Sequence, residues 1–168
     1  GTITDNKGSL RKVLKSEGDI IYLADDVTRI EEGAFQKEQG EEISATVLVM
    51  PGTAATVTLT ENCFDGSKVK QISCFSETQA ANVRKQLEGI HRTDIRVQTM
   101  KEAASGYWYT ADEDEGLTLV RVPEDITIFE GVKDKAGNEI AITAIGDNVF
   151  SKCRKLQWVI LPESVKKI

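Results

Sequence analysis

Three cysteines and one histidine are the residues of this chain whose side chains most often carry nucleophilic, redox or metal chemistry. The cysteines, Cys63, Cys74 and Cys153, are odd in number and show no metal-ligand spacing. His91 lies in a polar loop after a predicted helix stop, without a Cys or Ser nucleophile motif beside it. We therefore expect buried structural thiols, and no catalytic residue, metal site or cofactor.

The acidic run Asp112–Glu115 carries the kind of oxygen ligands that calcium binds. A calcium loop of the helix–loop–helix type needs glycine at its sixth position and glutamate at its twelfth. Here Gly116 falls at the fifth position and the late glutamate is missing. The run therefore predicts the solvated tip of a β-hairpin with arms at Tyr107–Tyr109 and Leu117–Val122.

The composition also excludes several kinds of partner. The chain has 168 residues, of which 40% are hydrophobic, and a formal net charge of −6. That acidic balance argues against binding to nucleic acid or to anionic membrane surfaces. No apolar run approaches the length of a membrane-spanning helix, so we expect no membrane span.

The elements that would position these residues follow from an internal repeat. All three prolines, Pro51, Pro123 and Pro162, have apolar residues one, three and six places before them. Ala24 ends a looser match. Shared spacing of this kind predicts a repeat architecture, with a short strand that ends where proline provides no amide donor.

A second motif is anchored on phenylalanine. Phe35, Phe64 and Phe150 mostly have apolar residues five and eight places before them, and we expect their rings to form an aromatic spine inside the fold. After Phe150 come Cys153 and Leu156, which we expect in the repeat core. Ile145 and Ile168 are 23 positions apart, within the range of about 20–29 typical of leucine-rich repeats.

The stretch from Ile142 to Ile168, ITAIGDNVFSKCRKLQWVILPESVKKI, resembles the BspA-like, bacterial surface-antigen class of leucine-rich repeats. Its units read Ile-x-x-Ile-Gly-x-x-Ala-Phe, then a small residue or Cys, then Leu-x-x-Val-x-Ile-Pro. Residues 24–35 and 50–64 match more loosely. The resemblance implies an α+β repeat fold, a leucine-rich-repeat solenoid of short strands with irregular or short helical returns.

Two segments interrupt this pattern. Ser76 to Gln79 reads as a helix capping box, apolar residues follow at helical spacing, and Gly89 is a natural stop. Residues 72–98 therefore predict a strand–helix–strand cap with its helix near 76–89. Between Pro123 and Ile142 about 16 residues are inserted, and they predict a β-hairpin with arms 126–132 and 140–143.

The resulting domain organisation has two arrays. Residues 1–98 form the first array with its capping helix, residues 99–106 a linker, and residues 107–168 the start of a second array. Because Ile168 stands where the next unit would begin, we expect the second array to be truncated and the chain to be a piece of a longer protein.

Function then depends on the outward residues of the strands, which alternate with the inward ones. They are Thr46, Val47 and Val49, then Lys70, Gln71 and Ser73, then Gln157, Trp158 and Ile160. The apolar members, Val47, Val49, Trp158 and Ile160, form the candidate binding face. The alternative is that Trp158 is covered by the inserted hairpin or by further repeats.

The leading hypothesis is a non-catalytic protein-binding or adhesion module of a bacterial cell-surface or secreted protein. The resemblance implies a protein of a host or bacterial surface as its partner. The alternatives are a structural spacer that carries another functional domain, and an accessory domain that binds glycans.

Overall fold

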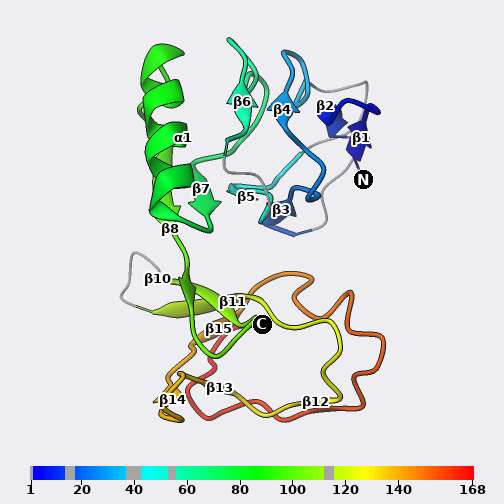
Figure 1. Ribbon diagram of the computed structural model, residues 1–168, viewed down its shortest axis with the longest axis vertical. Coiled ribbons are helices and arrows are strands. Elements are labelled where there is room, and N and C mark those ends of the chain that lie inside the picture. Colours follow the sequence, from blue (N-terminus) through cyan, green and yellow to red (C-terminus); the bar gives the residue numbers. More distant parts are fainter. Residues whose placement is uncertain (1, 14–17, 37–42, 53–55, 112–115) are drawn as a thin grey trace. The chain divides into compact units, whose positions relative to one another are not determined.

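The computed structural model describes residues 2–13, 18–36, 43–52, 56–111 and 116–168. The chain divides into two compact units, Gly1–Thr99 and Met100–Ile168 (Figure 1). Both consist mainly of short strands, and the helix found in the described residues, α1 (Glu77–Gly89), belongs to the first unit. The acidic hairpin tip predicted at residues 112–115 lies outside the described residues.

The first unit contains two four-stranded sheets, and the chain visits them alternately. In each sheet, strands that are two steps apart in the chain lie side by side and parallel, apart from the antiparallel hairpin β1·β2 that begins the first sheet. The first sheet consists of β1 (Thr2–Thr4), β2 (Ser9–Val13), β4 (Arg29–Ile30) and β6 (Thr58–Leu59). The second consists of β3 (Ile20–Tyr22), β5 (Val47–Val49), β7 (Gln71–Cys74) and β8 (Arg96–Thr99).

The register of these sheets places the same position of each repeat side by side. Leu10 pairs with Ile30, and Ile30 with Leu59, in the first sheet. In the second sheet Leu48 lies between Ile21 and Ile72. All are buried, and complete burial of such a side chain contributes about 1.5–3 kcal/mol. The repeat predicted from the spacing around Ile30 and Leu59 is therefore confirmed in this unit.

A left-handed turn precedes each phenylalanine of the motif. The residue two places before the ring has a positive φ in all three copies, at Gly33 (82°), Asn62 (61°) and Asn148 (60°). Glycine adopts this conformation freely and asparagine tolerates it better than most residues do. A Gly or Asn at this fixed place is a sequence signal of the turn that the apolar spacing alone did not reveal.

Helix α1 lies alongside β6, at the end of the row β1–β2–β4–β6 (Figure 1). There it occupies the place that another strand would take. Gln86 Oε1 accepts a hydrogen bond from Leu59 N at 2.7 Å, and Gln86 Nε2 donates to Val57 O at 2.8 Å. Two turns earlier in the helix, the Nε2 atom of the buried Gln79 donates to Pro51 O at 2.9 Å. The helix thus satisfies backbone groups that the repeat leaves open, which confirms the predicted cap.

The start of α1 differs in one detail from a capping box. The Ser76 hydroxyl accepts from Gln79 N at 3.1 Å, as predicted. However, Gln79 Oε1 accepts from Phe75 N at 2.9 Å, one residue before the N-cap, instead of from the N-cap amide itself. The reciprocal bond is displaced because the same side chain must also reach Pro51 O.

The helix ends at Gly89, as predicted, but the glycine is not the residue that turns the chain. Gly89 is itself helical, and the left-handed residue is His91, with φ 60°. His91 N donates to Glu88 O and Arg92 N donates to Leu87 O, the two hydrogen bonds of a Schellman motif. His91 therefore has a conformational role in the turn that ends the helix.

The second unit also alternates between sheets. Its first sheet contains β9 (Lys101–Glu102), β10 (Trp108–Ala111), β11 (Leu117–Arg121) and β15 (Ala144–Ile145), in the order β15-β11-β10-β9. Its second contains β12 (Ile128–Phe129) and β16 (Trp158–Val159), which are parallel. The predicted β10·β11 hairpin is confirmed. Residues 101–102 were expected in a linker, but they pair with β10 because their backbone groups complete the edge of that sheet.

The pairing of β11 corrects the proline pattern. Leu119 pairs with Ile145, whereas Phe129 pairs with Val159. Each repeat has two strands, and β11 is the first of them, like β15. Pro123 follows this first strand, whereas Pro51 and Pro162 follow the second strand of their repeats. The match arose because both kinds of strand alternate apolar residues and both can end at a proline.

The insertion in this unit is correspondingly smaller than predicted. The hairpin itself is present, as β13 (Val132–Lys133) paired antiparallel with β14 (Glu139–Ile140). However, Ile128 and Phe129 form β12 of the repeat and not an arm of the hairpin. The extra residues are thus confined to the segment between Phe129 and Ile142.

The aromatic spine forms as two separate pairs. The rings of Phe35 and Phe64 are 5.8 Å apart in the first unit. In the second unit the ring of Phe150 lies 5.1 Å from that of Phe129, edge to face, a partner that the predicted spine did not include. Leu156 packs against the core of the second unit, as expected.

The same five-residue turn occurs at the start of the first unit and at the tip of the inserted hairpin. In both, an aspartate accepts from the backbone two and four residues on: Asp5 from Lys7 and Ser9, Asp134 from Ala136 and Asn138. The fourth residue is a left-handed glycine, Gly8 or Gly137.

These two glycines give a matched test. Gly8→Ala would place a Cβ 2.5 Å from Asp26 O and 2.6 Å from Thr28 Oγ1, whereas a Cβ at Gly137 meets open space. We expect Gly137→Ala to destabilise its unit by about 1–2 kcal/mol through backbone strain alone. Gly8→Ala should add about 1–3 kcal/mol of overpacking. Urea unfolding of each variant measures the difference, and equal losses would contradict the close approach at Gly8.

The role of α1 can be tested at Gln86. Gln86→Ala leaves Leu59 N and Val57 O without their partner, and we expect a loss of about 1–3 kcal/mol. Circular dichroism at 222 nm follows α1, while both tryptophans, Trp108 and Trp158, belong to the second unit. The transition followed by circular dichroism should therefore shift and that followed by tryptophan fluorescence should not. Lys85→Ala, at the exposed neighbouring position, is the control with no expected shift.

Candidate protein-binding surface

The second unit carries an apolar surface centred on β16. Ile128 pairs with Trp158 across β12·β16, and Ile160 N donates to Phe129 O at 2.7 Å just beyond the strand. Trp158 is 67% exposed and Ile160 56% exposed. The large exposed apolar residues of the described chain all lie in this unit, and we call them the β16 surface: Ile128, Trp158, Val159, Ile160, Leu161 and Ile168. Contiguous apolar patches of this kind mark interaction sites.

The inserted hairpin does not cover Trp158. With two thirds of its surface exposed, the indole is accessible from solvent although its strand is hydrogen-bonded to β12. The alternative in which the hairpin β13–β14 buries this side chain is therefore wrong.

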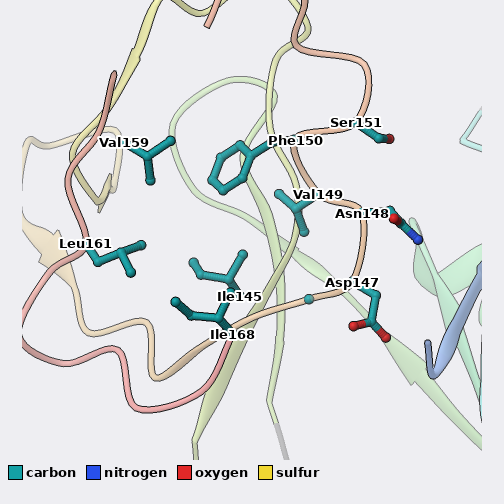
Figure 2. Close-up of a pocket in the computed structure, with 10 residues that line it drawn as sticks. Ile145, Asp147, Asn148, Val149, Phe150, Ser151, Val159, Leu161 and Ile168 are labelled. Atoms are coloured by element: carbon teal, nitrogen blue, oxygen red, sulfur yellow. The ribbon is translucent and has the colours of Figure 1, made fainter. Parts of the chain in front are cut away.

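A hollow of about 430 Å³ adjoins the strand. Figure 2 shows the side chains of Ile145, Val149, Phe150, Val159, Leu161 and Ile168 pointing toward one another around it. Asp147, Asn148 and Ser151 point away from the centre of the hollow (Figure 2). Ile168 reaches the hollow because Ile145 N donates to Lys167 O at 2.9 Å, which continues the ladder of β15 by one residue.

One edge of β16 has no strand beside it. The sheet contains β12 and β16 alone, and among the described residues no further strand pairs with β16. An exposed edge of this kind presents unpaired N–H and C=O groups that accept an added strand.

The candidate residues of the first unit behave differently. Val47 is half-buried, and Val49 is only 2% exposed, which corrects its predicted place on an exposed face. Val49 lies in register between Tyr22 and Ser73, and neighbours on both sides cover its short side chain. Ser73 is fully buried in the same row and accepts from Gln71 Nε2 at 3.2 Å.

The predicted face draws its residues from both units. Val47 and Val49 belong to the first unit, and Trp158 and Ile160 to the second. Sequence reasoning did not predict that the side chains of Ile128, Val159, Leu161 and Ile168 are exposed. Val159 and Leu161 were placed inward by their spacing, but their slots here face the hollow, where no further repeat of the described chain covers them.

The cysteines are held as thiols. Burial raises the pKa of Cys63 and of Cys74 to about 12. Burial also raises the pKa of Cys153, whose Sγ donates to Pro123 O at 3.5 Å. In the described part of the chain, no three His, Cys, Asp or Glu side chains come together as metal ligands would. No helix in that part has the length and apolar character needed to cross a membrane.

The thiols provide a test of this burial. Because their pKa values lie far above pH 8, about one thiol in ten thousand of Cys63 and Cys74 is ionised there. We expect an aromatic disulfide reagent to label neither residue in the native protein at pH 8 and to label all three cysteines in urea. Labelling of native Cys63 or Cys74 at the rate of free cysteine would contradict the buried arrangement.

The comparison with protein families matches the part of the chain that carries this surface. Residues 137–168 match the model described as BspA type leucine rich repeat region (6 copies). A search of curated proteins and a search of solved structures each returned no match. The matched residues include β15, β16 and the residues around the hollow, and they coincide with the stretch whose motif resembled this class. Residues 137–168 are therefore similar to a BspA type leucine rich repeat region.

Proposed function

We propose that this chain is a non-catalytic protein-binding module of a bacterial cell-surface or secreted protein, and that the β16 surface is its binding site. The observation that carries the proposal is Trp158, a large aromatic side chain left 67% exposed on a strand with a free edge. Tryptophan in such a setting is a frequent hot spot of protein interfaces.

The architecture supports a scaffold for binding. Both units stack short strands in parallel ladders, and α1 closes one ladder with a polar outer face, as the ends of a leucine-rich-repeat solenoid require. Such scaffolds work through extended surfaces. The three cysteines are buried, and His91 forms the left-handed turn that ends α1. The residue types best suited to catalysis therefore have structural roles in this chain.

The chemistry of the surface favours a protein over a glycan. Sugars bind on aromatic rings that are surrounded by hydrogen-bonding side chains, but the cross-strand partner of Trp158 is Ile128, and the next residue on its face of the strand is Ile160. An added strand and apolar side chains satisfy this surface better, because the backbone edge gives affinity and the apolar contacts give specificity.

The test is substitution of the exposed apolar residues. Trp158→Ser and Ile160→Ser change side chains that are mostly in solvent, so the protein should fold normally. We expect capture of proteins from host or bacterial surface extracts to fall by at least about tenfold, as loss of a hot spot implies. Quantitative pull-down with the purified chain measures the loss.

Val47→Ser, on the strand face of the first unit, is the comparison variant and should leave capture unchanged. Capture that is indifferent to Trp158 and Ile160 would leave a structural spacer as the better description. Capture lost through Val47→Ser would move the binding site to the first unit.

A further inference from the structure

We draw no further inference here: the strongest candidate, the outward face of β12 and β16 with the exposed side chains of Ile128, Trp158 and Ile160, belongs to the surface already described, and nothing in the structure shows what covers it, a further repeat or a partner.

Discussion

The register of the parallel ladders is the constraint on which the rest of this fold depends. A strand of two to five residues cannot bury its own inward side chain, so Ile30 is covered only because Leu10 and Leu59 lie beside it in the same position. Each repeat is therefore both core and cover for its neighbours. The left-handed turns at Gly33, Asn62 and Asn148 return the chain at a constant place, which keeps the register from one repeat to the next.

Because each repeat is covered by its neighbours, the ends of each ladder are the places where apolar side chains and backbone hydrogen-bonding groups need another cover. Each unit has an antiparallel hairpin near its start, β1·β2 or β10·β11, whose first strand covers one edge of the second. The row β1-β2-β4-β6 of the first unit ends against α1, whose Gln79 and Gln86 form hydrogen bonds with backbone groups of the residues before and within β6. At β16 the side chain of Val159 is 45% exposed, whereas Leu48 of β5 in the first unit is fully buried.

Sequence reasoning succeeded where several spacings had to agree. The Phe motif, Ile30 with Leu59, and the capping helix were predictable because each involves several residue types at fixed distances. Pro123 misled because three apolar positions before a proline fit either strand of the repeat, and only the pairing of Leu119 with Ile145 distinguishes the two. The exposure of Trp158 and Ile160 was predicted correctly because it follows from alternation along one strand. Val49 and Ile128 were not placed correctly because their exposure depends on neighbouring strands, which are distant in the sequence.

Helix α1 also fixes where this protein can gain or lose repeats. Because Gln79 and Gln86 bond to the particular backbone groups that follow β5 and precede β7, a repeat added after β7 would separate the helix from its partners. A repeat duplicated between β2 and β6 would instead leave both the starting hairpin and the closing helix with their present neighbours. The first unit is therefore built to change length from within, and its two ends can be inherited unchanged while the array between them expands or contracts.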